Sequence, residues 1–394
     1  RIQPASDFYF SFFKSQVFIF YLRVIMTVNF PQGQLISPNQ DKKNRLLLSN
    51  SPEELRQQFY ELKTPLDVAK LLNIPHKRLV YHLYLVDSQR RYKTFTIPKK
   101  SGGERQISTP ITALKIIQQK LNQVLQAVYQ VKPSVHGFVQ DKNIVTNAKA
   151  HVKKRYVLNL DLENFFPSVN FGRVRGMFMG IPYHLPPDVA TVLAQICCQN
   201  NQLPQGAPTS PMVTNMICGK MDSQLQRLAK DCKATYTRYA DDITFSTTLK
   251  DFPADLAYIV NKDESEKVFL GDRLSTIIRD NGFSVNEKKT RLQTKGNHQE
   301  VTGLTTNQFP NVDRRYVRQV RAMLHAWAKF GLESAQKEFE EKYHHKARFS
   351  GKEIPRFQDV LKGKIEFIGM VKGKDDGIYQ KYISQYYQLL KIYF

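Results

Sequence analysis

Two stretches of the chain share a pattern in which strand-forming residues lead to acidic side chains. Residues 156–161 form a largely apolar run that ends on Asp161, and residues 235–245 contain two strand-forming runs around Asp241 and Asp242. The first pattern predicts a buried strand that carries a carboxylate at its end. The second predicts a β-hairpin whose turn carries two carboxylates. Aspartate is also common in solvated turns and at helix caps, so each stretch alone leaves its role open.

Helical periodicity and capping signals predict the elements around these strands. A helix is expected to begin at Pro52 after a Ser51 cap. Further helices are expected over residues 64–72, 75–85, 110–129, 212 to about 228, 274–281 and 313–330, and a second hairpin over 92–97 and 105–109. Residues 250–271 are a polar insertion that we expect to be a solvated face. Residues 1–50 are expected to be an N-terminal extension or linker that partly precedes the natural start, because a methionine follows at Met26.

The charge balance indicates a polyanionic partner. The chain of 394 residues carries 58 Lys and Arg against 35 Asp and Glu, a formal net charge of +23. Neutralised phosphates supply much of the affinity for nucleic acids, although a basic surface also serves solubility or attracts anionic lipid. The four cysteines lack zinc-site spacing and disulfide density, so we expect reduced thiols in a cytoplasmic protein. No apolar run reaches the roughly 18 residues that span a bilayer, so no membrane partner is expected.

Acidic strand ends inside a basic chain point to one class of chemistry. If the strand that ends at Asp161 lies beside the hairpin turn, it joins Asp241 and Asp242 in offering the oxygen ligands that hard divalent cations prefer. Two such ions, about 3.5–4 Å apart, can activate a 3′ oxygen and stabilise a departing pyrophosphate. The three carboxylates are therefore candidates for nucleotidyl transfer.

Four motifs follow one another along the chain: LDLENFF at 160–166, LPQGAPTSP at 203–211, YADD at 239–242 and GFSVNEKKT at 282–290. This series resembles the reverse transcriptases over roughly residues 90–305. The resemblance implies an α+β right-hand polymerase fold with fingers, an α/β palm on an antiparallel sheet, and a helical thumb. It implies fingers at 51–154, palm at 155–310 and thumb at 311–394.

Two further elements are similar to those of the retron branch of that family. They are Asn-Ala-x-x-His at residues 147–151 and Val-Thr-Gly at residues 301–303. Taken singly, His151 is also typical of a core or capping histidine, and Gly303 of a turn glycine. The resemblance implies that Asn147, His151, Val301, Thr302 and Gly303 bind RNA.

The resemblance also implies roles at the catalytic centre. Asp161 and Asp241 are expected to be the main ligands of two Mg²⁺ ions, for which Mn²⁺ can substitute, with Asp242 as a supporting carboxylate and the Leu162 carbonyl as an extra ligand. Lys289 corresponds to a lysine that protonates departing pyrophosphate. Simple charge complementarity with phosphate is an equal alternative for Lys289.

Three residues match positions that bind the incoming deoxynucleoside triphosphate. Arg105 would grip the triphosphate through bidentate contacts, unless it belongs to an exposed basic loop. Phe166 would lie under the sugar and exclude a ribose 2′-OH, unless it packs in the core. Gln205 would contact the base and sugar at a glycine-containing helix entrance, unless it is a polar cap.

The segment after the Val-Thr-Gly element predicts a helix with two stripes. Apolar residues form one stripe along this helix, and Arg314, Arg318 and Arg321 form a basic stripe beside it. One face would pack on the protein while the other meets RNA phosphates, as in a polymerase thumb. A solvated basic face without a partner is the alternative.

The resemblance to retrons implies a specific activity and set of partners. The chain is expected to be an RNA-directed DNA polymerase that uses a structured noncoding RNA as template and primer, starts DNA from a 2′-OH and makes a branched RNA-linked DNA (msDNA). A separate effector protein in phage defence and a host ribonuclease H that removes template are the other expected partners. A group II intron-like or other phage-defence reverse transcriptase, and an RNA-binding scaffold that restrains a toxic effector, are the alternatives.

Overall fold

The structure is a computed structural model that describes residues 47–98, 102–262, 265–347 and 354–393. The chain divides into two compact units. Among the described residues, the larger unit comprises 47–143 and 154–294, and the smaller unit comprises 144–153 and the residues from 295 onward. The predicted N-terminal extension lies outside the described residues up to position 46.

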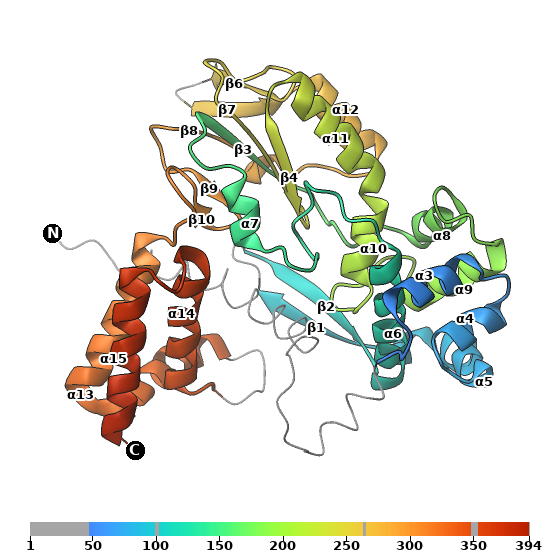
Figure 1. The fold of residues 1–394 in the computed structure, drawn as a ribbon, viewed down its shortest axis with the longest axis horizontal. Helices are drawn as coiled ribbons and strands as arrows, with labels where there is room; N and C mark the ends of the chain where they lie inside the picture. The colour runs from blue at the N-terminus through green and yellow to red at the C-terminus, as the bar shows by residue number, and fades with distance from the viewer. Residues whose placement is uncertain (1–46, 99–101, 263–264, 348–353, 394) are drawn as a thin grey trace. The chain divides into compact units, whose positions relative to one another are not determined.

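A four-stranded antiparallel sheet is the centre of the larger unit (Figure 1). Its order is β4–β5–β3–β8, formed by Thr235–Tyr239, Asp242–Thr247, Tyr156–Asp161 and Arg291–Thr294. Both strand predictions are confirmed, since β3 ends at Asp161 and β4 and β5 form a hairpin around Ala240 and Asp241. Val157, Leu158 and Leu160 of β3 are buried, as expected for a central strand with both faces covered.

Helices surround this sheet and form most of the remaining larger unit. They are α3 (Pro52–Tyr60), α4 (Pro65–Leu71), α5 (His76–Val80), α6 (Thr112–Val128), α8 (Phe171–Met179), α9 (Pro187–Cys197), α10 (Ser210–Ile217), α11 (Gly219–Asp231) and α12 (Asp272–Asp280). Ser51 and Glu54 form a capping box at α3, and Thr64 and Asp67 form one at α4, so both helices begin where the cap signals predict. A π-helical turn (Tyr81–Leu85) and a 3₁₀ turn (Ser88–Arg91) link α5 to the next strand.

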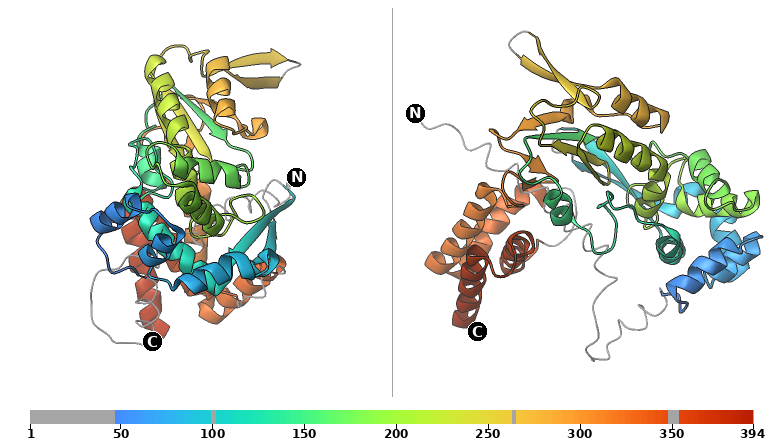
Figure 2. Two further views of the ribbon diagram at one scale, coloured as in Figure 1. Left: turned by 90° about the vertical axis from the view of Figure 1, so that its right-hand side faces the viewer. Right: turned by 45° about the horizontal axis from the view of Figure 1, so that its top comes forward.

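Two hairpins accompany the central sheet. Strands β1 (Tyr92–Pro98) and β2 (Glu104–Pro110) pair in register from Tyr92↔Pro110 to Pro98↔Glu104, which confirms the predicted second hairpin. Strands β6 (Ala257–Lys262) and β7 (Ser265–Leu270) form another hairpin that projects beyond α12 (Figure 2). The segment expected only as a polar, solvated insertion is therefore a β-hairpin, whose side chains Tyr258 and Ile259 are exposed.

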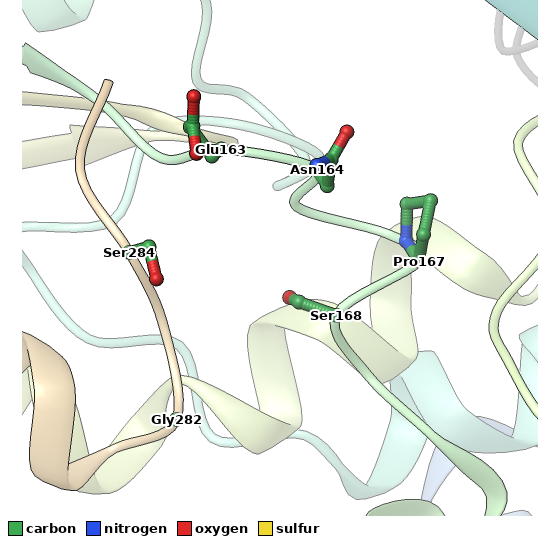
Figure 3. Close-up of a pocket in the computed structure, with 6 residues that line it drawn as sticks. All are labelled: Glu163, Asn164, Pro167, Ser168, Gly282 and Ser284. Atoms are coloured by element: carbon green, nitrogen blue, oxygen red, sulfur yellow. The ribbon is translucent and has the colours of Figure 1, made fainter. Parts of the chain in front are cut away.

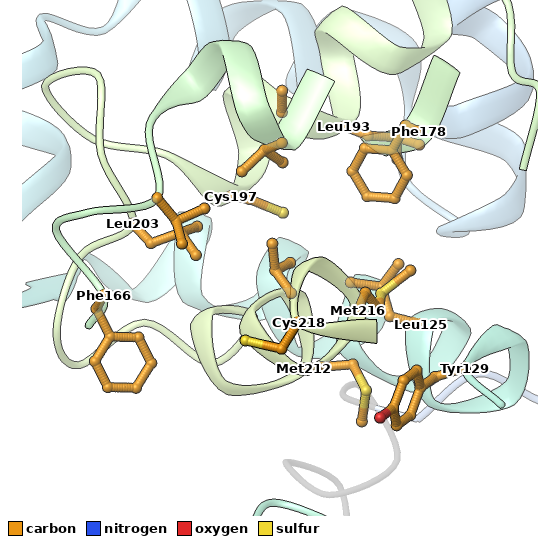
Figure 4. Packing of buried hydrophobic residues seen from close by; sticks show 14 of the residues in the cluster. Leu125, Tyr129, Phe166, Phe178, Leu193, Cys197, Leu203, Met212, Met216 and Cys218 are labelled. Carbon is orange, nitrogen blue, oxygen red and sulfur yellow. The ribbon is translucent and has the colours of Figure 1, made fainter. Parts of the chain in front are cut away.

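One buried cluster joins the helices and the sheet of the larger unit. It reaches from Phe59 of α3 through Leu121 and Leu125 of α6 to Leu158 and Phe245 of the sheet. Figure 4 shows part of it, where Phe166 and Leu203 lie among side chains of α9, α10 and α6. The segments that carry the LDLENFF and LPQGAPTSP motifs are thus anchored in the same core.

In its described residues, the smaller unit combines a short helix, two short strands and three long helices. These are α7 (Ile144–Lys149), β9 (Glu300–Val301), β10 (Leu304–Thr305), α13 (Arg314–Ala347), α14 (Phe357–Lys372) and α15 (Gly377–Tyr393). Trp327 of α13 is fully buried against Phe357 and Tyr386, with ring centroids 6.2 and 5.5 Å away. The aromatic contacts join the three long helices into one bundle.

Two helix predictions were wrong in their extent. The helix expected from Met212 to about Leu228 is two helices that meet at Cys218, just before Gly219. The helix expected over 313–330 continues to Ala347, but Gly331 interrupts it with φ 83° and ψ 167°. Glycine adopts this left-handed backbone without a Cβ penalty, which explains why the regular stripe ends at Phe330.

Candidate active site

The antiparallel register brings the predicted carboxylates to one end of the sheet. Asp161, the last residue of β3, is the cross-strand partner of Asp242, the first residue of β5. Asp241 lies in the adjacent hairpin turn, and its carbonyl accepts a 3.0 Å hydrogen bond from the Leu162 amide. Asp161 and Asp242 thus become neighbours, although they are far apart in the sequence, because β3 pairs with β5 rather than with β4.

The charges at this end of the sheet influence one another. Burial raises the pKa of Asp241, and the nearby negative charge of Asp161 raises it further. The positive charges of Arg105 and Lys289 act in the opposite direction on the same carboxyl. Asp241 therefore lies close enough to Asp161 for like-charge repulsion, which a bound cation would relieve.

Lys289 contacts the first carboxylate directly. Its Nζ donates hydrogen bonds of 2.9 Å to both carboxylate oxygens of Asp161. Backbone contacts fix this approach, since the Asn286 amide donates to the Asp161 carbonyl at 2.8 Å and a 3₁₀ turn (Glu287–Lys289) follows. The GFSVNEKKT motif is thereby tied to the end of β3.

The donor set fits hard divalent cations in its chemistry. Carboxylate and backbone carbonyl oxygens are the ligands that Mg²⁺ prefers, and the ammonium group of Lys289 already occupies a cation position beside Asp161. With the side chains as placed, the described part of the chain contains no group of three or more His, Cys, Asp or Glu side chains arranged to hold a metal.

Two of the three predicted nucleotide contacts come from the β1–β2 hairpin and the LPQGAPTSP segment. Arg105 of β2 is exposed, and its charge reaches Asp241. The Gln205 carbonyl accepts a 2.8 Å hydrogen bond from the Ser108 amide, which ties that segment to β2. A Cβ at Gly206, where φ is 118°, would lie 3.0 Å from Ile107 and Ser108, so glycine permits this close approach.

The third predicted contact, Phe166, belongs to the core in this structure. Its side chain is 8% exposed and packs against Phe138 and Phe165, with ring centroids 6.3 and 5.5 Å away. The structure shows the packing alternative and leaves the role in sugar selection as a prediction.

The two retron-like elements are contiguous within the smaller unit. Asn147 Nδ2 donates to Thr302 Oγ1 at 3.4 Å, and that hydroxyl donates to the Ile144 carbonyl at 3.4 Å. Asn147, His151 and Val301 are buried, whereas Thr302 and Gly303 are partly accessible. Arg314, Arg318 and Arg321 are all exposed on α13. The arginines are thus placed to meet a ligand, while the buried residues join α7 to the β9–β10 turn.

Comparison with known proteins gives the family. The family model described as reverse transcriptase (RNA-dependent DNA polymerase) matches residues 97–307, which include all four motifs. The retron Mx65 reverse transcriptase of Myxococcus xanthus is 34% identical over 319 residues, which cover 75% of this chain and 71% of that protein.

The chain belongs to the retron reverse transcriptases. Two other relatives are the retron Mx162 enzyme of Myxococcus xanthus, 35% identical over 67% of this chain and 59% of its own length, and the retron Ec86 enzyme of Escherichia coli, 33% identical over 66% and 76%. A solved telomerase of Candida albicans in complex with a telomeric RNA fragment aligns with 76% of this chain and 63% of that chain, at 11% identity and a TM-score of 0.39.

Family membership confirms two predictions about this retron reverse transcriptase. It is an RNA-directed DNA polymerase, and its mixed helices and antiparallel sheet belong to the right-hand polymerase fold. No helix in the described ranges has the length and apolar character needed to cross a membrane.

A shallow pocket of about 360 Å³ opens beside the carboxylate end of the sheet of this reverse transcriptase (Figure 3). It lies between the turn after β3 and the segment after α12, and is lined by Glu163, Asn164, Pro167, Ser168, Gly282 and Ser284. Arg173 fixes the two walls, because its guanidinium donates to the carbonyls of Ser168, Asn281 and Gly282 at 2.7–3.1 Å. Sequence inspection did not single out Arg173, whose signal is only an arginine within a short helix.

Proposed function

We propose that this reverse transcriptase synthesises msDNA, a branched RNA-linked single-stranded DNA, from a dedicated structured noncoding RNA by two-metal nucleotidyl transfer. The observation that carries the proposal is the register in which Asp161 lies opposite Asp242, with Asp241 in the adjoining turn. The likeness to retron reverse transcriptases supports the choice of a noncoding RNA as template. In this proposal the same RNA is also the primer, and DNA grows from one of its 2′-OH groups.

Separate residues would bind the metal ions and donate the proton at this centre. Asp161 and Asp241, supported by Asp242 and the Leu162 carbonyl, would hold two Mg²⁺ ions. The ions would supply activation of the attacking oxygen and charge neutralisation of the departing pyrophosphate. Lys289 is held within hydrogen-bond reach of Asp161, so its ammonium group is available to give a proton to that pyrophosphate.

Three residues would position the incoming deoxynucleotide. Arg105, exposed on β2 and near enough to influence Asp241, would bind the triphosphate through its planar guanidinium. Gln205 would contact base and sugar from a segment tied to β2 through its own carbonyl. Phe166 would meet the sugar and exclude a 2′-OH.

The RNA would bind the smaller unit through exposed basic residues. Arg314, Arg318 and Arg321 recur at intervals of four and three residues, so they share one face of α13. The 147–151 and 301–303 elements would support this RNA contact. With this assignment, fingers correspond to residues 51–154, palm to 155–310 and thumb to 311–394.

The product would serve antiphage defence together with a separate effector protein in the cytoplasm, after a host ribonuclease H removes template RNA. Purifying the chain from its host and sequencing the nucleic acid that comes with it tests the proposal. The expected result is DNA joined through a 2′-OH to an RNA, present with the parent protein and missing when Asp241 and Asp242 are both changed to Ala. Recovery of RNA without attached DNA from the parent would contradict it.

The same double variant separates the polymerase from a scaffold in a phage challenge. Loss of protection together with loss of DNA supports synthesis as the function. Protection that persists without any DNA would favour an RNA-binding scaffold that restrains an effector.

A further inference from the structure

A buried ion pair lies directly behind the carboxylate turn. Arg238 of β4 and Asp222 of α11 are both fully buried, and Arg238 Nε and Nη2 donate to the two Asp222 oxygens at 2.7 and 2.8 Å. Tyr236 donates its hydroxyl to Asp222 Oδ1 at 2.7 Å. This bidentate geometry satisfies the carboxylate and leaves one guanidinium nitrogen, Nη1, for other partners.

The remaining nitrogen reaches the backbone of the catalytic turn. Arg238 Nη1 donates to the Ala240 carbonyl at 3.0 Å and to Asn215 Oδ1 of α10 at 3.2 Å. Asn215 in turn donates to the Gly137 carbonyl at 2.9 Å. Because Ala240 precedes Asp241, the guanidinium holds the peptide unit that sets the direction of that carboxylate.

The backbone held in this way is strained. Ala240 has φ 57°, a left-handed conformation that is unfavourable for residues with a Cβ. Gly137 packs closely on the same residue, since an added Cβ would lie only 2.4 Å from the Ala240 nitrogen. Ala240 is therefore fixed by Arg238 and Gly137, and a strained residue persists only when its surroundings fix it.

A second set of contacts supports β4 from its open edge. The Arg238 amide donates to the Ser134 carbonyl at 2.9 Å, and its carbonyl accepts from the His136 amide at 2.8 Å. Lys142 Nζ stabilises the loop that contains Ser134 and His136, because it donates to the carbonyls of Pro133 and Val135 at 2.7 and 2.9 Å. The backbone and the side chain of Arg238 are thus both immobilised.

We infer that Arg238 is a positioning residue for catalysis, which holds the Ala240–Asp241 peptide so that the Asp241 carboxylate faces Asp161. A buried ion pair adds little net stability compared with apolar packing, so stability alone does not account for this network. The Arg238 Nη1 group, which the ion pair does not use, donates to the Ala240 carbonyl of the catalytic turn as well as to Asn215. The inference rests on the proposed role of Asp241 in metal binding.

The test compares Arg238→Lys with Tyr236→Phe. Lysine keeps the charge but cannot hold Asp222 through two parallel bonds and also reach Ala240, because it lacks the planar fork. Tyr236→Phe removes a hydrogen bond from the same carboxylate and leaves the Arg238–Ala240 contact intact. For both variants, the measurements are thermal unfolding, kcat and KM for deoxynucleotide, the Mg²⁺ concentration for half-maximal rate, and amide hydrogen exchange over residues 239–243 without metal.

We expect Arg238→Lys to lower kcat about 100-fold, to raise the half-maximal Mg²⁺ concentration and to speed amide exchange in the turn, since small misplacements of reacting groups have effects of this size. Tyr236→Phe should change unfolding but leave kcat within about twofold of the parent. If the two variants lose activity only in proportion to their loss of stability, Arg238 is structural and the inference is wrong.

Gly137→Ala keeps the test decisive if Arg238→Lys does not fold. The added Cβ would press on the Ala240 nitrogen without removing a side chain of the Arg238–Asp222 pair, so it should give the same kinetic and exchange changes. Normal kcat and normal exchange in Gly137→Ala would contradict the inference. Full activity in Asp241→Asn would instead overturn the proposed function, which separates the two failures.

Discussion

Lys289 is joined to Asp161 by two hydrogen bonds, with Nζ 2.9 Å from each carboxylate oxygen. The two residues are 128 positions apart, and the contact depends on the backbone bond between Asn286 and the Asp161 carbonyl. Without metal, the lysine therefore compensates the charge that a cation would otherwise neutralise. In the proposed mechanism, the same ammonium group would give a proton to the departing pyrophosphate.

Replacing Lys289 distinguishes proton donation from simple charge pairing. We predict that Lys289→Gln lowers the single-turnover rate about 100-fold, within the range typical of a lost general acid. Lys289→Arg keeps the positive charge but gives up its proton far less readily, so it should remain slow. Rapid-quench measurement of one nucleotide addition checks this, and an Arg variant as fast as the parent would show that charge alone suffices.

Phe166 is predicted to select against ribonucleotides through its ring. Phe166→Val should raise incorporation of ribonucleotides relative to deoxynucleotides at least tenfold, because the smaller side chain makes room for a 2′-OH. The change also opens space beside Phe138 and Phe165. It should lower the free energy of unfolding by less than a Phe→Ala change in a core, which typically costs about 3–5 kcal/mol. Primer extension with each nucleotide class measures the ratio.

Phe165→Leu is the matched control for that substitution. Phe165 is buried against Phe166 and Phe283, so its replacement perturbs the same core. It should lower stability without changing sugar selection. An equal change in selectivity for the two variants would mean that core loosening is the cause.

His136 makes the stability of the larger unit dependent on pH. Burial, and secondarily the charge of Lys142, lowers the pKa of His136 to about 4, from an ordinary value of 6.5. Between these values the unfolded chain binds the proton more readily than the folded chain, so the free energy of unfolding falls as pH drops from 6.5 toward 4. Urea unfolding at several pH values should show this slope, and His136→Gln should reduce it. An unchanged slope in that variant would contradict the assignment.

The hydrogen bond between Asn147 and Thr302 predicts that the two retron-like elements act as one unit. Asn147→Ala and Thr302→Val should each lower stability and RNA affinity, and the double variant should lose less than the sum because the two side chains share a contact. A double-mutant cycle on RNA binding and on unfolding measures the coupling. Strictly additive effects would show that the elements act separately.

Local sequence patterns predicted most of the secondary structure but not its pairing. The apolar run before Asp161 and the strand formers around Asp241 gave β3 and the β4–β5 hairpin, and the Ser51 and Thr64 caps gave α3 and α4. These strands and helix starts are determined by residues that are close together in the sequence. The insertion of β3 between β5 and β8, which places Asp161 opposite Asp242, depends on contacts between distant segments.

Other features were missed because their cause is tertiary. The β6–β7 hairpin was missed because the polar run at its tip, residues 262–267, indicates a solvated insertion. The apolar Tyr258 and Ile259 are both exposed, so β6 lacks the alternation of a half-buried strand. Arg238 is an arginine inside a strand, which looks unremarkable until its partner Asp222 is brought to it by α11. Nothing in the spacing of Asn147 and Thr302 indicates that they share a hydrogen bond.

The most direct test of the account is single-nucleotide addition on an RNA template by Asp241→Asn, with Asp251→Asn, an exposed aspartate outside the site, as the control. The account predicts a rate at least about 1,000-fold below the parent for Asp241→Asn, because asparagine cannot supply the negative charge that metal binding requires, and a rate within about twofold of the parent for Asp251→Asn. An Asp241→Asn enzyme that adds nucleotides at the parental rate would contradict it.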